Sequence, residues 1–270
     1  MVQVTFLGTG AAFSNRRRTN VALLVNEQEG DTDVVTNFLI ECGPTILYQL
    51  ERAGLAVTQI DHLFISHRHG DHFLGLPMFL LLRSFSGVSK PLSIHASEEV
   101  IQAGQELMRL VFPEFDGRLE HVEWVETPAD RPAQAQLGPS LQFSTLPTVH
   151  SRHVSSLALR LDFANGRSLV YTGDTAFNER LVELAQGCDL LVHESNYSET
   201  LQPEIKPDTY GGHSTAYQAG RIAAMAGCKI LALVHLSPAY AGRESKVRAE
   251  AMRAFDGPVI IPSDGTTLYL

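Results

Sequence analysis

Residues 66–72 read SHRHGDH and place three histidines and one aspartate in seven positions of a chain that has 11 histidines. Neutral imidazole and carboxylate are the ligands that Zn²⁺, Mn²⁺ or Fe²⁺ takes in a site without thiolates. His67 and His69 share one face if the preceding strand continues to residue 69, and Asp71 and His72 then lie on the turn into a helix. One short segment can therefore serve two metal ions.

Three more candidate ligands end apolar runs further along the chain. They are His150 in LPTVH, Asp174 in YTGDT and His235 in ALVH. A single histidine or aspartate at a strand end is commonly a turn or capping residue, and each of the three can be explained in that way. The histidine cluster and the three strand-end residues are unlikely to occur together by chance, so the seven residues indicate a metal site.

Composition narrows the remaining classes of protein. The chain has 270 residues and a formal net charge of −9, which argues against broad, sequence-independent binding of nucleic acid. Cys42, Cys188 and Cys228 lie far apart without a Cys-x-x-Cys pair, so we expect reduced thiols and metal ligands of nitrogen and oxygen. No signal peptide and no stretch of about 20 apolar residues is evident, so we expect a cytoplasmic protein with no membrane partner.

Short apolar or alternating runs predict strands in both halves of the chain. The predicted strands cover residues 2–8, 20–25, 37–41, 62–66, 92–96, 141–150, 155–163, 167–174, 188–195 and 228–235. Helical patterns cover residues 44–54, 72–84, 97–111, 176–186, 215–226 and 243–255. The fifth helix opens on a capping-box pattern of Thr215 and Gln218.

Residues 127–140, TPADRPAQAQLGPS, are the most linker-like stretch and divide the chain into two nearly equal halves. Each half has strands first and helices interspersed. This order favours two halves packed sheet to sheet with helices outside, a four-layered αββα sandwich of the α/β class. We expect one domain over residues 1–270, although composition alone leaves two separate domains open.

The motifs carry a resemblance to a known family. SHRHGDH resembles the His-x-His-x-Asp-His signature of the metallo-β-lactamase-fold hydrolases, and the three strand-end candidates follow in that family's order. The resemblance covers essentially the whole chain. It is closest to the ribonuclease Z-like phosphodiesterase branch, through FLGTG (6–10), YTGDT (171–175), HES (193–195), GGHST (211–215) and LVHLSPAY (233–240).

The resemblance implies two divalent metal ions, with Zn²⁺ favoured over Mn²⁺ or Fe²⁺. One ion is expected on His67, His69 and His150, and the other on Asp71, His72 and His235, with Asp174 bridging them. A water held between two cations loses its proton near neutral pH and becomes the nucleophile. The pair can also hold the attacking and leaving oxygens of a displacement at phosphorus.

The same resemblance implies three catalytic residues. His213 of GGHST is expected to protonate the leaving oxygen, helped by Glu194 of HES, and Asp71 to orient the nucleophilic water. A carboxylate beside an imidazole raises its pKa into the range that suits a general acid. The simpler alternatives are that His213 only precedes a helix and that Glu194 ends a strand in solvent. His153 is a weaker alternative ligand that we expect to line the cleft.

The substrate is expected to be a phosphodiester, either a small molecule or an RNA 3′ end. Ribonuclease Z enzymes typically carry a glycine-rich, basic arm between the first histidine cluster and the next ligand, and no such arm is visible between His72 and His150. Eight carboxylates between residues 98 and 126 would also repel a polyanion. We therefore favour a small or cyclic phosphodiester over tRNA 3′ processing, for which a homodimer partner can supply the binding surface.

Two further functions stay open at this point: hydrolysis of a lactone, thioester or carboxylic ester, and a non-enzymatic metal-binding scaffold. GGHST with HES argues against the first, and the complete set of seven ligands argues against the second. Gly8 and Gly10 do not indicate dinucleotide binding, because the third glycine of that fingerprint is absent. Arg16, Arg17 and Arg18 can contact a substrate phosphate or lie in a solvated loop.

Overall fold

The computed structural model describes residues 1–270 except 29–34, 88, 116–118, 120, 139–140 and 206–210. Two seven-stranded sheets form its centre. The first sheet has, in spatial order, β14 (Thr266–Tyr269), β1 (Val2–Gly8), β2 (Ala22–Gln28), β3 (Val35–Ile40), β4 (His62–Phe64), β5 (Leu92–Ala96) and β6 (Val122–Glu126). The second has β13 (Val259–Ile260), β12 (Ile230–Val234), β11 (Leu190–Glu194), β10 (Ser168–Tyr171), β9 (Leu157–Asp162), β8 (Leu141–Pro147) and β7 (Ala133–Leu137).

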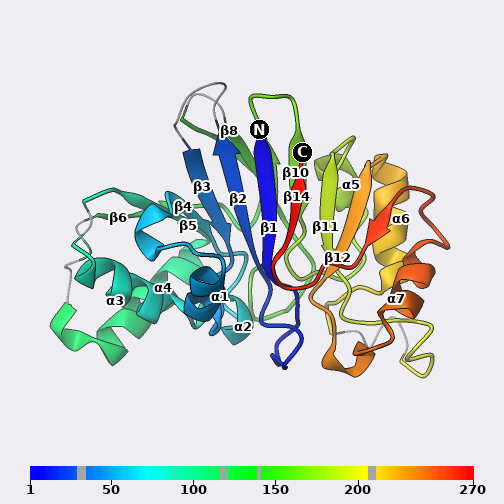
Figure 1. Ribbon diagram of the computed structural model, residues 1–270, viewed down its shortest axis with the longest axis horizontal. Helices are drawn as coiled ribbons and strands as arrows, with labels where there is room; N and C mark the ends of the chain where they lie inside the picture. Colours follow the sequence, from blue (N-terminus) through cyan, green and yellow to red (C-terminus); the bar gives the residue numbers. More distant parts are fainter. Residues whose placement is uncertain (29–34, 88, 116–118, 120, 139–140, 206–210) are drawn as a thin grey trace.

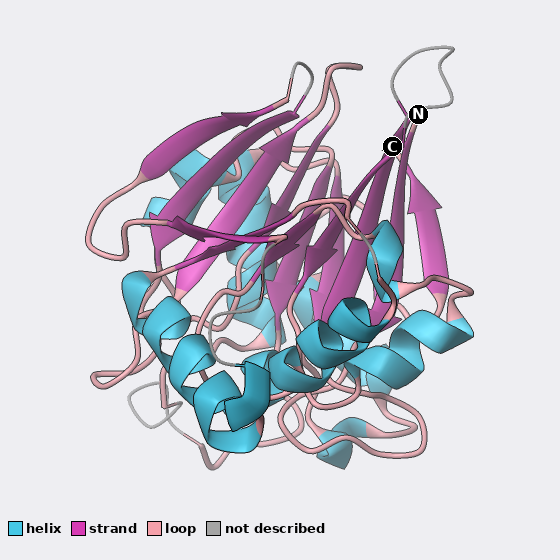
Figure 2. Ribbon diagram, turned by 90° about the vertical axis from the view of Figure 1, so that its left-hand side faces the viewer, coloured by secondary structure: helices cyan, strands magenta, loops and turns pink. Residues whose placement is uncertain are grey.

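Helices cover the outer face of each sheet. Beside the first sheet lie α1 (Ile46–Arg52), α2 (Gly70–Phe73), α3 (Leu76–Phe85) and α4 (Glu98–Val111), and beside the second lie α5 (Arg180–Leu184), α6 (Ala216–Ala226) and α7 (Glu244–Ala251). Short 3₁₀ turns occur at η1 (Val57–Gln59), η2 (Pro113–Phe115) and η4 (Pro238–Tyr240). Figure 1 shows the strands between the two groups of helices, and Figure 2 views the molecule from the side of α1–α4. The expected four-layered αββα sandwich is confirmed.

Three buried clusters hold the layers together. The central cluster joins apolar residues of both sheets, among them Phe6, Phe38 and Phe143, and therefore lies between the sheets. A second cluster packs the first sheet against α1, α3 and α4, and a third packs the other sheet against α5, α6 and α7. Burial of these side chains is the main favourable contribution to folding.

Strand direction explains why the candidate residues meet at one edge. β3, β4, β5 and β6 are parallel to one another, and so are β10, β11, β12 and β13. β8 runs in the direction of β10, because each is antiparallel to β9. His150, Asp174 and His235 all follow strands of this one direction, and residues 66–72 follow β4. The carboxyl ends of such strands are where α/β sheets generally form their sites.

Several sequence-based boundaries were wrong. Residues 127–140 are not a linker, because β7 lies within them and pairs with β8. β4 ends at Phe64, so His67 and His69 lie in a loop and do not share a strand face. The helix expected at 72–84 is two helices, since the backbone N–H of Gly75 donates to the carbonyl of Cys42 outside the helix. β6, β7, β13 and β14 were not predicted.

Candidate metal centre and active site

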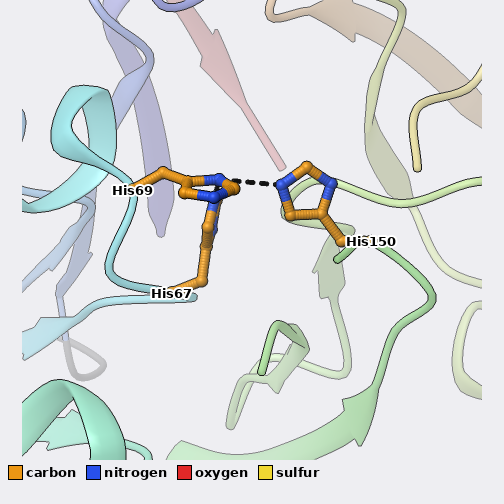
Figure 3. A group of neighbouring side chains, drawn as sticks. All are labelled: His67, His69 and His150. Carbon is orange, nitrogen blue, oxygen red and sulfur yellow. Dashed lines mark hydrogen bonds between the residues drawn. The ribbon is translucent and has the colours of Figure 1, made fainter. Parts of the chain in front are cut away.

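The first group of ligands consists of His67, His69 and His150. Nδ1 of His69 lies 3.0 Å from Nε2 of His67 and 2.9 Å from Nε2 of His150. His67 and His69 lie in the loop after β4, and His150 approaches them from the loop after β8 (Figure 3). In His67 and His150 the ring nitrogen that faces away from His69 also has a polar partner. His67 Nδ1 lies 2.9 Å from Ser66 Oγ, and His150 Nδ1 lies 2.9 Å from the carbonyl oxygen of Gly212.

The second group consists of Asp71, His72 and His235. Oδ2 of Asp71 lies 3.2 Å from Nε2 of His72 and 3.1 Å from Nε2 of His235. Burial alone would raise the pKa of Asp71, but its contacts with the two histidines lower that pKa well below the usual range. The carboxylate is therefore ionised and available as a ligand at neutral pH.

Asp174 lies between the two groups. Its Oδ2 is 3.7 Å from Nε2 of His67, 3.4 Å from that of His72, 3.8 Å from that of His150 and 3.5 Å from that of His235. Burial raises the pKa of Asp174, but the surrounding histidines lower it well below its ordinary value. Its other oxygen, Oδ1, is buried without a hydrogen-bond partner among the described residues. A carboxylate in this position can contact an ion in either group.

The donor set fits divalent metal ions. In both groups the candidate ligand atoms lie within 4.8 Å of one another. A third set of the same kind, His67, His72 and Asp174, takes one histidine from each group and joins them to Asp174. A tetrahedral Zn²⁺ with ligands at about 2.0–2.1 Å holds them about 3.3 Å apart, which is close to the observed nitrogen separations. Buried nitrogens that converge in this way repel one another unless they share a proton or a cation, and both nitrogens of His72 lack a hydrogen bond in the described structure.

His213 and Glu194 form a pair beside the two groups. Nδ1 of His213 lies 2.9 Å from Oε1 of Glu194, whose side chain is 1% exposed. Glu194 also accepts hydrogen bonds from the backbone N–H groups of Thr175, Asn196 and Ser214. Burial by itself lowers the pKa of His213, but the charge and hydrogen bond of Glu194 together with Asp174 raise it to about 9. The imidazole is therefore positively charged near pH 7 and can donate a proton.

Gly212 brings this pair against the first ligand group. Its φ is +83°, a value that L side chains rarely adopt, and a Cβ there would lie 1.6 Å from the carbonyl oxygen of His150. The loop before His213 therefore lies directly on the backbone of His150. The glycine at this position is required by both backbone conformation and space.

Two residues at the edge of the site have strained backbones. Glu41, after β3, has φ of 71°, and His235, after β12, has φ of 54°. Among the described residues these are the two non-glycine residues with positive φ. Such strain is commonly retained where a fixed side-chain direction is needed.

All nine candidate site residues of the sequence lie together in this centre, while the role of each stays a prediction. His153 does not join them: it is exposed, and its carbonyl accepts a hydrogen bond from Arg68. Arg18 is also not a free phosphate contact, because it is buried and donates to Thr9 Oγ1 and to the carbonyl of Pro262. Arg16 and Arg17 are exposed.

Sequence reasoning missed two supporting residues, Glu41 and Gly212. Glu41 ends the apolar run NFLIE, so the strand-end rule that found the other candidates would also have found it. Gly212 lies within a motif that was recognised, but its close approach to His150 joins residues 62 positions apart. No local pattern reports such a contact.

Comparisons with known proteins agree with the architecture and with the metal chemistry. The family model described as Anti-Pycsar protein Apyc1 matches residues 2–205. A ribonuclease Z from Halorubrum lacusprofundi is 33% identical over 313 aligned residues, covering 98% of this chain and 96% of the relative.

Solved structures of the metallo-β-lactamase fold are also similar. YhfI from Bacillus subtilis, a metallo-β-lactamase fold protein, superposes with a TM-score of 0.79 at 24% identity, covering 99% of this chain and 98% of that one. The short form of human tRNase Z gives a TM-score of 0.76 at 24% identity, with the same coverage. This chain is therefore a metal-dependent hydrolase that belongs to the ribonuclease Z-like metallo-β-lactamase-fold proteins, in the family described as Anti-Pycsar protein Apyc1.

Proposed function

We propose that this protein is a phosphodiesterase that hydrolyses a small or cyclic phosphodiester. The observation that carries the proposal is the His213–Glu194 pair, whose nitrogen and oxygen are 2.9 Å apart beside two convergent groups of metal ligands. A charged imidazole at this place can protonate the poor alkoxide leaving group of a natural phosphodiester. Lactone and thioester hydrolysis has less need of such an acid, and the complete ligand set argues against a non-enzymatic scaffold.

The ligands divide between two divalent ions, which we take to be Zn²⁺, with Mn²⁺ or Fe²⁺ as alternatives. His67, His69 and His150 would hold one ion, Asp71, His72 and His235 the other, and Asp174 both. When bound, the ions supply an ionised water near neutral pH and neutralise charge on the phosphate. Asp71 has a second role in this proposal, since its carboxylate can accept a hydrogen bond from the attacking water and so orient it.

The described residues between His72 and His150 include no glycine-rich, basic arm, which supports a small substrate. The alignment with the Halorubrum ribonuclease Z spans 313 positions against 270 residues here, so at least 43 positions of the relative have no counterpart in this chain. The described part of residues 73–149 forms packed helices and strands of the sandwich. Of the eight carboxylates between residues 98 and 126, five are exposed: Glu98, Glu106, Glu114, Glu123 and Glu126. Asp116 and Glu120 lie outside the described residues.

Processing of an RNA 3′ end is the second candidate. It is favoured by the 33% identity to a protein named ribonuclease Z over 98% of this chain. Without an arm in the same chain, RNA would have to be held by a partner, and the predicted homodimer would provide one. Light scattering on purified protein tests that assembly directly: a mass near that of one chain at micromolar concentration would contradict it.

One experiment separates these functions. Metal-loaded protein is assayed with a 3′,5′-cyclic nucleotide, a precursor tRNA, a panel of lactones and bis(p-nitrophenyl) phosphate. We expect hydrolysis of the cyclic nucleotide and of the aryl diester, with little cleavage of the tRNA. Preferred cleavage of precursor tRNA would select the second candidate, and preferred hydrolysis of lactones would reject both.

The role of His213 is tested by the leaving group. His213→Ala should keep both metals and lose about 10²–10⁴-fold in kcat on the cyclic nucleotide, the usual contribution of general acid catalysis. Bis(p-nitrophenyl) phosphate releases a nitrophenolate that needs no proton, so the variant should be far less impaired on it. Glu194→Gln should show the same dependence in weaker form. Equal losses on both substrates would remove His213 from the proton transfer.

We also propose that residues 1–270 form a single folding unit. Support comes from β14, whose residues Thr266–Tyr269 pair with β1 at the other end of the chain. Limited proteolysis should release no stable half that keeps metal. A stable fragment ending near residues 127–140 would contradict a single unit.

Among the described helices, none combines the length and the apolar character that a bilayer crossing requires.

A further inference from the structure

Glu250 on α7 is a buried carboxylate outside the metal centre, 1% exposed. Its Oε1 accepts hydrogen bonds from the backbone N–H groups of Glu199 and Tyr217, at 3.0 Å and 3.2 Å. Its Oε2 accepts from Ser198 Oγ at 2.6 Å and from the N–H of Thr200 at 2.8 Å. Four donors match the acceptor capacity of an ionised carboxylate, so the group is well satisfied although it is buried.

The four donors belong to two separate segments. Ser198, Glu199 and Thr200 follow β11, which ends at Glu194, whereas Tyr217 lies in the first turn of α6. α7 packs closely against α6, because a Cβ on Gly220 of α6 would lie 2.3 Å from the carbonyl oxygen of Ala251 on α7. This close approach lets Glu250 reach both segments. Glu250 therefore ties the segment after β11 to the start of α6.

The two partners of the acid pair lie just before these two segments. Glu194 is the last residue of β11, four residues before Ser198, and His213 lies three residues before the first residue of α6, Ala216. Between them, the N–H of Tyr197 donates to the carbonyl of Ser214 at 3.1 Å, and the N–H of Ala216 donates to that of Tyr197 at 3.2 Å. Glu250 fastens both segments immediately beyond this pairing. The pairing of Tyr197 with Ser214 and Ala216 therefore connects Glu250 to the region of Glu194 and His213.

The energetic cost of Glu250 argues that this tie is needed. A buried carboxylate is expensive to desolvate, and no basic side chain of the described structure forms an ion pair with Glu250. Backbone N–H groups and one hydroxyl provide all its compensation. An apolar residue would fill the space at lower cost but would leave the N–H groups of Glu199, Thr200 and Tyr217 without an acceptor.

We propose that Glu250 is a positioning residue for proton transfer, which holds the segment of His213 against that of Glu194 so that the imidazole is aimed at the leaving oxygen. This rests on the proposed role of His213 as general acid. The hydrogen bonds of Glu250 go to Ser198, Glu199, Thr200 and Tyr217 and to none of the candidate ligands, so we expect its loss to act on the proton-transfer step and to spare the metal ions.

Glu250→Gln is the test. An amide replaces one acceptor oxygen by a donor, which then faces N–H or O–H groups of the two segments. We expect both metals to be retained, with a roughly 10- to 100-fold loss of kcat on the cyclic nucleotide, the scale of a small misplacement of a catalytic group. The loss on bis(p-nitrophenyl) phosphate should be less than about threefold, because the nitrophenolate needs no proton.

Asp189→Asn is the control for loss of a buried carboxylate, although Asp189, unlike Glu250, also pairs with Arg167 and Lys229. Asp189 is 5% exposed, accepts from the N–H of Ser168, and lies just before β11, at the end of that strand opposite Glu194. It should lower the melting temperature while impairing both substrates alike. If Glu250→Gln behaves like this control, or if it loses a metal ion, Glu250 is merely structural and the proposal is wrong.

A milder variant covers the case in which Glu250→Gln does not fold. Ser198→Ala removes one of the four donors and should give the same leaving-group dependence with a smaller loss. Failure of the inference differs from failure of the proposed function. If His213→Ala shows the leaving-group dependence and both Glu250→Gln and Ser198→Ala do not, only the positioning role of Glu250 is wrong. If His213→Ala itself shows no such dependence, the proposed role of His213 as general acid is wrong.

Discussion

Oε1 of Glu41 lies 3.3 Å from Nδ1 of His72, and both side chains are completely buried. The contact leaves Nε2 of His72 directed at Asp71 and Asp174. Burial lowers the pKa of His72, but Asp174 and Glu41 together raise it well above its ordinary value in the metal-free protein. A carboxylate behind a ligand histidine fixes the ring and makes it a stronger ligand.

Glu41→Gln should therefore weaken metal binding. The amide keeps the size of the side chain but removes the charge facing His72. We expect a loss of about 10- to 100-fold in affinity for one of the two ions, the usual effect of removing such a support. Competition with a chelator, read by elemental analysis, measures it. Glu51→Gln, at an exposed position of α1, is the control, and equal metal retention in the two variants would contradict the role of Glu41.

Asp174→Asn tests whether one carboxylate serves both ions. The amide keeps one oxygen for coordination but loses the charge that lies within 3.4–3.8 Å of four imidazole nitrogens. Metal content should drop from two ions toward one, and turnover should fall steeply. A variant that keeps two ions and wild-type turnover would show that Asp174 is not shared.

Gly212→Ala should disrupt the site from the backbone. The added Cβ would lie 1.6 Å from the carbonyl oxygen of His150, so the loop before His213 must move away from the ligand. We expect loss of metal and a lower melting temperature. Gly211→Ala is the matched control: it also has positive φ, of +55°, but a Cβ there meets no atom within 4 Å. Similar behaviour of the two variants would mean that backbone strain alone is responsible.

The stability of the metal-free protein should depend on pH through His213. Its pKa of about 9 in the folded chain lies above the ordinary 6.5, so the protonated imidazole stabilises the folded state. This contribution is fully present below about pH 6.5 and is lost as pH rises through about 9. Melting temperatures in the presence of a chelator from pH 6 to 10 should therefore fall more for wild type than for His213→Gln. Parallel curves would contradict the raised pKa.

Motif and periodicity were sufficient for much of the fold. The predicted strands at residues 2–8 and 92–96 match β1 and β5, and the capping box of Thr215 and Gln218 opens α6 as expected. These features depend on side-chain alternation and on hydrogen bonds between near neighbours, so the sequence alone carries them. β7 was missed because its residues, AQAQL, are poor strand formers, and pairing with β8 determines their conformation.

The candidate metal ligands could also be named from residue type, because imidazole and carboxylate chemistry does not depend on the fold. How these side chains meet depends on the packing of distant segments. The convergence of His69 on His150, the charge on His213 and the support of His72 by Glu41 all depend on burial and on segments far apart in the chain. Parallel strand direction in two packed sheets brings these segments to one edge, and desolvation there makes each contact strong.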